Sequence, residues 1–344
     1  MPPPASAAGS GVGWMELTEL DRTLPPLVLI GGPTAAGKTA LALALADRFP
    51  VRLISADSVQ VYRGMDIGSA KPEAAILSRY PHALIDIRDP EEGYTAADFV
   101  REAGREIRES TAAGTIPVLV GGTPMYLKAL RYGLDPMPTA NPALRRRIER
   151  DAEAVGWAAM HHRLAELDPV IAARIRPNDP QRIERALEIC LLSGRPASEL
   201  QRGRGPDRMR DAIHIVICPA DRGELHRRIE QRWQAMLRAG FLDEVRGLVQ
   251  RPGFDRTAPA WRAVGYRQAL ECIEQRSPVD ELARRGAAAT RQLAKRQLTA
   301  FRQWTGAFWY DPLNKTTINR IIKRVEPVNP ANRPHRPDVH KDRQ

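Results

Sequence analysis

The chain is poor in cysteine and has no long hydrophobic run. Its 344 residues include three cysteines, Cys190, Cys218 and Cys272, at positions that match no metal-binding spacing. We therefore expect neither a disulfide framework nor a cysteine metal site, and each thiol is predicted to be a small buried side chain in a reducing compartment. No stretch of about 18 apolar residues occurs, so no membrane-spanning helix is expected. These absences favour a cytoplasmic protein without a membrane partner.

Both ends of the chain lack the apolar patterns of folded elements. Residues 1–24 are rich in Pro, Ala and Gly and have neither a basic start nor a continuous apolar stretch. They are predicted to be a disordered extension rather than a secretory signal. Residues 313–344 are predicted to be a largely disordered tail, because their last part is rich in Pro, Asn, Arg and Lys.

Acidic residues are missing from one stretch of a chain whose formal net charge is +11. Between Arg284 and Arg302 there are six cations and no Asp or Glu. A solvated helix face usually mixes both signs, so an unbroken basic helix favours an anionic polymer or phosphate partner. An arginine-rich composition also follows from a GC-rich genome, and net charge alone leaves both explanations open.

One short segment carries more information than any other. It matches the phosphate-binding pattern G-x-x-x-x-G-K-[ST] in full, and it follows an apolar strand and precedes a helix rich in Ala and Leu. Backbone N–H groups and a helix N-terminus would bind phosphate oxygens there, Lys38 would reach the outer phosphate, and the Thr39 hydroxyl would hold Mg²⁺. The residues of this predicted diphosphate or nucleotide site are Gly32, Pro33, Thr34, Ala35, Ala36, Gly37, Lys38 and Thr39.

Strand-like and helix-like segments alternate along most of the chain, which predicts a parallel α/β sheet of the P-loop NTPase type. The expected strands are Leu27–Ile30, Val51–Ser55, Ala83–Ile87, Pro117–Val120, Ile213–Cys218 and Ala307–Tyr310. Only helical patterns occur from 141 to 211, where Asn141-Pro142, Asp168-Pro169 and Asp179-Pro180 are typical helix starts. We therefore predict a core formed by 25–140 and 212–312, interrupted by an all-helical insertion at 141–211.

The strand Pro117–Val120 does not end in the aspartate that nucleotide hydrolases usually place there. It is followed by Gly121-Gly122-Thr123. The sequence thus predicts a phosphate site without an evident apparatus for ATP hydrolysis.

A dense polar cluster follows the second strand. Asp57 is placed at a strand end beside the phosphate-binding loop, together with Ser58 and Gln60. An isolated Asp in that position is most often a turn or cap residue. In this cluster its carboxylate is also a candidate general base or Mg²⁺ ligand, and the Gln60 amide suits a nucleobase edge.

These motifs, taken in order, resemble those of the tRNA dimethylallyltransferases, also called tRNA isopentenyltransferases. The resemblance covers roughly Pro26 to Trp304, and its departures from the family pattern are small: Ala36, Ala83 and Pro124-Met125. Besides the phosphate-binding loop, it rests on the segments Ser55–Gly68, Ala70–Pro72, Leu84–Ile87, Gly121–Thr123, Tyr126–Leu130, Arg176–Ile183, Val264–Gln268 and Thr290–Thr299.

The resemblance implies prenyl transfer from dimethylallyl diphosphate, with Mg²⁺, to N6 of the adenosine 3′ of the anticodon in tRNAs that read codons starting with U. Asp57, Lys38 and Thr39 are then the expected catalytic residues, and Arg228 and Arg232 are expected to bind the diphosphate. We expect a monomer that binds the anticodon stem-loop and extrudes the adenosine from its stack. The residues expected to contact tRNA are Asp57, Ser58, Val59, Gln60, Thr123, Arg145, Gln181, Arg182, Ile183, Glu184, Arg185, Arg262, Gly265, Tyr266, Arg267, Lys295, Arg296, Gln297 and Arg302.

Two other functions share parts of this pattern. An adenylate isopentenyltransferase performs the same chemistry on a free nucleotide, but the helical insertion and the basic stretch favour tRNA. A small-molecule P-loop kinase would transfer phosphate from ATP. The arginines of the insertion are also compatible with a solvated helix face.

Overall fold

The computed structural model describes residues 23–201, 203 and 205–329, so the predicted N-terminal extension and the end of the tail lie outside the described residues, apart from 23 and 24. The chain divides into two compact units. We call residues up to Arg131 and from Asp207 onward the α/β unit, and Tyr132–Pro206 the helical unit. Within the described ranges, no helix has the length and apolar character needed to cross a membrane.

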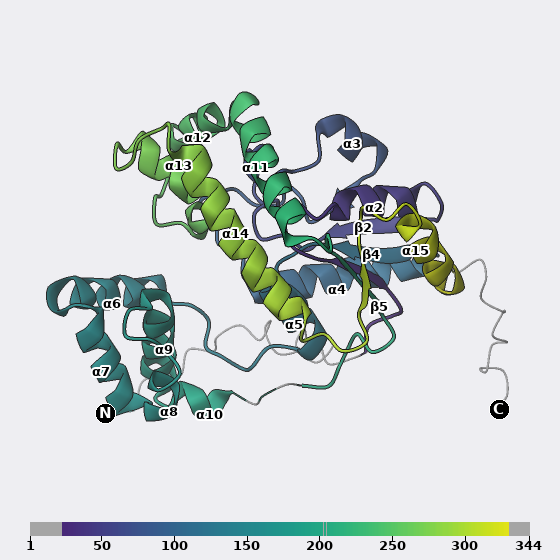
Figure 1. Ribbon diagram of the computed structural model, residues 1–344. Helices are drawn as coiled ribbons and strands as arrows, with labels where there is room; N and C mark the ends of the chain where they lie inside the picture. The colour runs from purple at the N-terminus through teal and green to yellow at the C-terminus, as the bar shows by residue number, and fades with distance from the viewer. Residues whose placement is uncertain (1–22, 202, 204, 330–344) are drawn as a thin grey trace, which may run out of the picture. The chain divides into compact units, whose positions relative to one another are not determined.

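The α/β unit is built on one parallel sheet of six strands (Figure 1). The order is β3-β2-β4-β1-β5-β6, which confirms the predicted P-loop-like α/β class. The strands are β1 (Val28–Gly31), β2 (Val51–Ser55), β3 (His82–Ala83), β4 (Ile116–Val120), β5 (Ile213–Ile217) and β6 (Phe308–Tyr310). All six lie within two residues of the predicted starts, but β3 ends early because Leu84 and Asp86 have positive φ angles of 64° and 54°.

Alternate residues of the strands point to opposite faces of the sheet and pack into two separate apolar layers. In β1, Val28 and Ile30 pack with α2 and α15, which lie next to each other (Figure 1), whereas Leu29 packs with α4, α5 and α11–α14. Burial on both faces explains why these strands are continuous apolar runs. The helices are α2 (Lys38–Ala46), α3 (Ala74–Arg79), α4 (Ala96–Ala112), α5 (Pro124–Tyr132), α11 (Arg222–Arg238), α12 (Phe241–Val249), α13 (Tyr266–Ile273), α14 (Leu282–Phe301) and α15 (Thr317–Val325), with 3₁₀ turns η1 (Pro259–Arg262) and η2 (Glu326–Val328).

The helical unit has its own small core, formed by residues such as Ile148, Leu164 and Leu187. Its helices are α6 (Pro142–Val155), α7 (Trp157–Leu167), α8 (Pro169–Ala172), α9 (Pro180–Ser193) and α10 (Ala197–Leu200). The three predicted helix starts are confirmed. Side chains of Asn141, Asp168 and Asp179 each accept a backbone N–H in the first turn, and a proline follows each of them.

The chain leaves and re-enters the α/β unit at one place. Arg131 Nη2 lies 2.6 Å from Asp207 Oδ2, and Arg208 N donates to Arg131 O at 2.8 Å. The division therefore falls at 132 and 206, where we had predicted 141 and 211. The difference arises because 207–211 returns to the α/β unit, where Met209 is buried in the core.

The C-terminal prediction needs correction for residues 313–329. Instead of disordered chain, the structure contains α15, which buries Ile321 and Val325 against the sheet. Apolar residues at a spacing of four place both side chains on one helix face, and this short pattern outweighs the polar composition around it.

Candidate active site

Loops from three adjacent strands meet at one edge of the sheet. Gly32–Thr39 follows β1, Ala56–Gln60 follows β2 and Gly121–Thr123 follows β4, and β4 lies between the other two strands. Backbone bonds continue past the strands, since Ala56 N donates to Val120 O at 2.8 Å. Carboxyl ends of parallel strands share an edge, so segments distant in sequence form one site.

Close approach of the backbone explains the glycines that follow β4. A Cβ built at Gly121 would lie 2.2 Å from Ala56 O. At Gly122 it would lie 2.5 Å from Gln297 Nε2 and 2.9 Å from Gly32 O. Any side chain here would separate the three loops, which is why glycines rather than an aspartate occupy this strand end.

The phosphate-binding loop has the backbone that an anion site requires. Ala35 and Gly37 have positive φ angles of 63° and 94°, and Gly37 is the N-cap of α2. The Lys38 ammonium lies over the loop and donates to Gly32 O at 3.1 Å and Pro33 O at 2.8 Å. Phosphate oxygens are acceptors of the same kind, so a ligand can replace these carbonyls.

Gln297 of α14 joins two of the loops. Its Oε1 accepts from Thr34 N at 2.9 Å, and its Nε2 donates to Gly122 O at 2.8 Å. Both ends of one buried amide are thus used by backbone groups. This side chain fixes the spacing between the phosphate-binding loop and the end of β4.

Asp57 has both of the roles considered for it, because it forms a turn and also contributes a carboxylate to the site. Its Oδ1 accepts from Val59 N at 2.8 Å and Gln60 N at 3.3 Å, which is a side-chain-capped turn. The turn leaves Oδ2 for other groups. Ser58 N donates to Thr123 Oγ1 at 3.1 Å, so the predicted nucleotide-contacting residues of the second and third loops adjoin each other.

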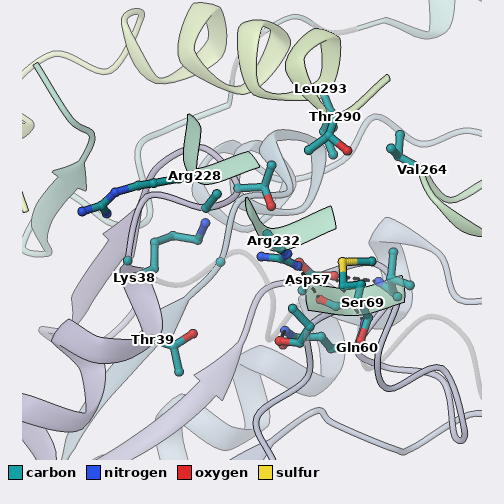
Figure 2. Close-up of a pocket in the computed structure, with 18 of the residues that line it drawn as sticks. Lys38, Thr39, Asp57, Gln60, Ser69, Arg228, Arg232, Val264, Thr290 and Leu293 are labelled. Carbon is teal, nitrogen blue, oxygen red and sulfur yellow. Dashed lines mark hydrogen bonds between the residues drawn. The ribbon is translucent and has the colours of Figure 1, made fainter. Parts of the chain in front are cut away.

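A cavity of about 700 Å³ opens beside these loops. Lys38 and Thr39 lie on one side of it in Figure 2, and Val264, Thr290 and Leu293 lie on another. The phosphate-binding side and the Asp57 side are polar, whereas further lining comes from apolar side chains. These apolar residues include Val59, Ile76, Val120, Trp233, Met236, Val264 and Leu293.

Two cations besides Lys38 come from α11. Arg232 Nη2 donates to Ser69 O at 3.2 Å, and its guanidinium is labelled next to Asp57 in Figure 2. Arg228 takes a different direction, with Nε bonded to Glu224 Oε1 at 2.7 Å. Its Nη1 lies 3.9 Å from a Cβ built at Gly37, so it faces the end of the phosphate-binding loop.

Burial weakens the charged forms of these cations. Loss of hydration lowers the pKa of Lys38 to about 8, against the attraction of Asp57 and with a smaller repulsion from Arg232. Burial also lowers the pKa of Arg232, and Asp57 opposes that change. A cavity that holds partly desolvated cations is suited to a ligand with several negative charges.

The donor set fits a magnesium ion bound together with a diphosphate. Thr39, in the first turn of α2, and Asp57 line the same cavity. The described residues contain no cluster of three or more His, Cys, Asp or Glu that would bind a metal on its own. Mg²⁺ commonly takes one or two protein oxygens, with phosphate and water as its remaining ligands.

Comparisons with known proteins agree with this site. Residues 60–304 match the protein family described as IPP transferase. The chain belongs to that family. It is 53% identical over 303 residues to a tRNA dimethylallyltransferase of Thiobacillus denitrificans (strain ATCC 25259 / T1), covering 88% of this chain and 96% of the relative.

Solved structures show the same relationship. A tRNA isopentenylpyrophosphate transferase from Bacillus halodurans has 35% sequence identity and a TM-score of 0.63, and the match covers 88% of this chain and 95% of that protein. A tRNA delta(2)-isopentenylpyrophosphate transferase from Staphylococcus epidermidis has 29% identity and a TM-score of 0.61, covering 88% and 98%. A eukaryotic dimethylallyltransferase acting on tRNA shares the fold, with 24% identity, a TM-score of 0.70, and coverage of 91% and 81%.

Some residues that are expected to contact tRNA are buried, and for these the expectation of direct contact needs correction. Tyr266 is fully buried, and its hydroxyl donates to Glu244. Gly265 is buried beside Trp233, and the buried Gln297 side chain is bonded to the backbone of two loops of the site. The motif around Gly265 is therefore explained by packing.

The helical unit gives a mixed result. Ile183 and Glu184 are buried in it, whereas Gln181 and Arg182 on the same helix are exposed. Arg145 and Arg185 are both bound to the buried Glu188. The alternation follows the helical period, which a continuous sequence motif conceals.

Exposed positions remain for the other predicted contacts. Arg262, Arg267, Lys295, Arg296 and Arg302 are exposed in the α/β unit. Two other cations of α14 are paired with acids from other segments, since Arg285 binds Glu271 and Arg291 binds Glu230 at 3.1 Å. The basic stretch is thus partly neutralised by residues far away in the sequence.

The structure adds residues that the sequence did not indicate. Ser69, Trp233 and Thr290 line the cavity, and Trp233 Nε1 donates to Thr290 Oγ1 at 2.9 Å. Gly286 makes room for this indole, because a Cβ there would lie 2.2 Å from the ring. No local pattern distinguishes such a tryptophan from a core residue.

Proposed function

We propose that this protein is a tRNA dimethylallyltransferase. It transfers a dimethylallyl group from dimethylallyl diphosphate to N6 of the adenosine 3′ of the anticodon, in tRNAs that read codons starting with U. It acts in the cytoplasm as a monomer. The observation that carries this proposal is the shared cavity, in which a phosphate-binding loop, a free carboxylate oxygen and an apolar lining meet. The relatives at 53% and 35% identity support the tRNA substrate.

The phosphate-binding loop would hold the leaving group. As the C–O bond of the donor breaks, its electron pair stays with the diphosphate, and the carbon gains allylic cation character. Lys38 and Arg232 would stabilise the growing negative charge, together with N–H groups of the loop. Arg228 would approach from the loop end marked by Gly37.

Thr39 is the residue that would hold Mg²⁺ beside the diphosphate, because one oxygen of Asp57 stays in the turn and the other acts on the acceptor. When bound there, the ion neutralises charge on the leaving oxygen. Apolar side chains such as Val264 and Leu293 would exclude water from the allylic carbon.

Asp57 would act on the acceptor. An exocyclic amine is a weak nucleophile because its lone pair is delocalised into the ring. As the new N6–C bond forms, Asp57 Oδ2 would take the N6 proton, while Oδ1 stays in the turn. Gln60 and Thr123 would contact the extruded nucleotide.

One assay tests the proposal. The protein is incubated with dimethylallyl diphosphate, Mg²⁺ and undermodified tRNA, and the digested tRNA is analysed by mass spectrometry for N6-(dimethylallyl)adenosine. Appearance of this nucleoside at the position 3′ of the anticodon supports the proposal. Modified AMP without modified tRNA indicates an adenylate isopentenyltransferase, and ATP consumption with a phosphorylated metabolite indicates a kinase.

A further inference from the structure

A five-residue segment forms part of the cavity wall. Residues Asp66–Ala70, which we call the wall segment, precede Lys71, and the cavity is lined by Gly68, Ser69 and Ala70. The segment is a compact turn, since Ala70 N donates to Ile67 O at 3.0 Å. Lys71, whose side chain is buried, bonds Tyr62 O at 2.9 Å and so fixes the C-terminal end.

A single carboxylate fixes the other side of the wall segment. Glu244 Oε2 accepts from Asp66 N at 3.0 Å and Ile67 N at 2.6 Å. Its Oε1 accepts from Gly68 N at 3.2 Å and from the Tyr266 hydroxyl at 2.7 Å. Three successive backbone N–H groups thus point at one side chain of α12, and charge-assisted bonds of this kind are stronger than neutral ones.

Packing leaves the wall segment no room to shift toward α12 and α13. A Cβ built at Gly68 would lie 2.3 Å from Phe241 Cε2 and 2.6 Å from Tyr266 Cζ. The glycine backbone therefore rests directly on two aromatic rings, and Glu244 determines its position along them.

The opposite side of the wall segment holds two cavity side chains. Ser69 O accepts from Arg232 Nη2 at 3.2 Å, and Ala70 O accepts from Gln60 Nε2 at 3.3 Å. Figure 2 shows Ser69, Arg232 and Gln60 gathered on the Asp57 side of the cavity. Groups that bind Glu244 and groups that orient the site are thus consecutive in one turn.

We propose that Glu244 is a positioning residue, which holds the wall segment so that Ser69 O directs the Arg232 guanidinium at the diphosphate. The proposal rests on the proposed function of this cavity as a diphosphate site. Glu244 touches no substrate, and it acts through the backbone of Gly68 and Ser69. Such indirect support matters because small misplacements of a charged group lose much of its effect.

The test replaces the Glu244 carboxylate, which only accepts hydrogen bonds, with an amide that also donates them. In Glu244→Gln one carboxylate oxygen becomes an NH₂ group that faces N–H donors, which loosens the wall segment. We expect the Kd of inorganic pyrophosphate, measured by calorimetry with Mg²⁺, to rise about tenfold. The matched control is Asp243→Asn on the same helix, whose exposed carboxylate is paired with Arg246. It should leave the Kd unchanged.

A double-mutant cycle separates positioning from general loss of structure. In an Arg232→Met background, Glu244→Gln should have no further effect on pyrophosphate binding, because the group it positions is gone. Additive losses would overturn the proposal, as would an unchanged Kd in Glu244→Gln alone.

If Glu244→Gln does not fold, Tyr266→Phe serves in its place. It removes one of the four hydrogen bonds to the carboxylate, and a smaller loss with the same dependence on Arg232 is expected. Additivity with Arg232→Met would again count against the proposal. Because the probe is pyrophosphate without tRNA, a wild-type protein that binds it but modifies no tRNA would overturn the proposed function and leave this inference standing.

Discussion

One cluster of a carboxylate and two cations in the helical unit and one in the α/β unit differ in how their charges meet. In the helical unit, Glu188 binds Arg145 at 2.9 Å and also binds Arg185; we call this the Glu188 cluster. In the α/β unit, Asp57 faces Lys38 and Arg232 across the cavity; we call this the Asp57 cluster.

In the Glu188 cluster the carboxylate is buried and is bonded directly to both arginines. Glu188 is 0% exposed, and its oxygens also accept from Asn141 N at 2.7 Å. In the Asp57 cluster, the cations donate instead to backbone carbonyls. Cations that neutralise a carboxylate stabilise the fold, whereas cations bonded to neutral carbonyls keep their charge for a ligand. The predictions below test this distinction, from the largest expected effect to the smallest.

Removing the carboxylate of the Asp57 cluster should abolish most turnover. Asp57→Ala is expected to retain tRNA binding but to lower kcat for prenyl transfer by at least ~100-fold, because the N6 proton loses its acceptor. The measurement is the rate of N6-(dimethylallyl)adenosine formation under saturating tRNA.

Asp57→Asn is the matched control for the turn. An amide oxygen can still accept from Val59 N and Gln60 N, so the turn persists while the proton acceptor is lost. Its kcat should be as low as that of Asp57→Ala. A fast Asn variant with a slow Ala variant would make the Asp57 cluster structural, like the Glu188 cluster.

Removing the carboxylate of the Glu188 cluster should act on stability. Glu188→Ala removes the carboxylate that binds Arg185 and leaves Arg145 only its longer 3.5 Å pair with Glu184. The substitution is expected to cost about 3 kcal/mol of unfolding free energy. Urea unfolding followed by hydrogen exchange in the helical unit measures this loss. The prenyl transfer rate at saturating substrate below the unfolding midpoint should change little, and a rate loss without destabilisation would contradict the comparison.

The same cluster predicts an effect of acid. Burial alone would raise the pKa of Glu188, but hydrogen bonds from Arg145 and Arg185 outweigh it and lower the pKa below its ordinary 4.5. Its stabilisation is therefore complete above about pH 4.5 and is lost as the pH falls through the lowered pKa. Glu188→Ala should remove this part of the acid sensitivity of the helical unit.

The open cations of the Asp57 cluster should make ligand binding sensitive to alkaline pH. Because the pKa of Lys38 is lowered to about 8, the free protein loses this charge above that pH. A bound diphosphate restores the proton, so the affinity for pyrophosphate should fall by up to about tenfold for each further pH unit.

Lys38→Arg is the control, since a guanidinium stays charged throughout this range. Calorimetry from pH 7 to pH 9.5 on both proteins removes the titration of pyrophosphate itself from the comparison. Parallel pH curves for the two proteins would show that Lys38 does not titrate there.

The smallest effect is expected on the surface of α14. Arg291 is paired with Glu230, whereas no ion pair holds the exposed Arg296 within the described part of the chain. Arg296→Ala should weaken tRNA binding a few-fold and reduce the salt dependence of the affinity by about one phosphate contact. Arg291→Ala should have a smaller effect on both the affinity and its salt dependence. The opposite order would contradict the distinction between cations that are paired with a carboxylate and cations that are left for a ligand.

Local patterns explain why much of the fold could be predicted. The loop from Gly32 to Thr39 is specified by eight consecutive residues, and the strands around it are continuous apolar runs. Asp57 could be placed in the site because the ends of parallel strands share an edge. The family, the fold class and the prenyl transfer function predicted from the sequence are confirmed.

The remaining parts of the site depend on contacts between distant segments. Gln297 and Gly122 are separated by 175 positions, and Glu244 and Gly68 by 176. In the sequence, Glu244 has the pattern of a residue on a solvated helix face. Tyr266 and Ile183 show the opposite error, because motif membership suggested tRNA contact where the side chains are buried. A single sequence reports the order of residues but not which helix face meets which loop.

The ion pair between Arg131 and Asp207 joins the two points at which the chain leaves and re-enters the α/β unit, so the helical unit is an insertion at a single place. The chain enters and leaves the α/β unit at adjoining residues, so a short glycine linker can replace 132–206 without stretching the sheet. Such a deletion should leave the cavity and its pyrophosphate binding intact.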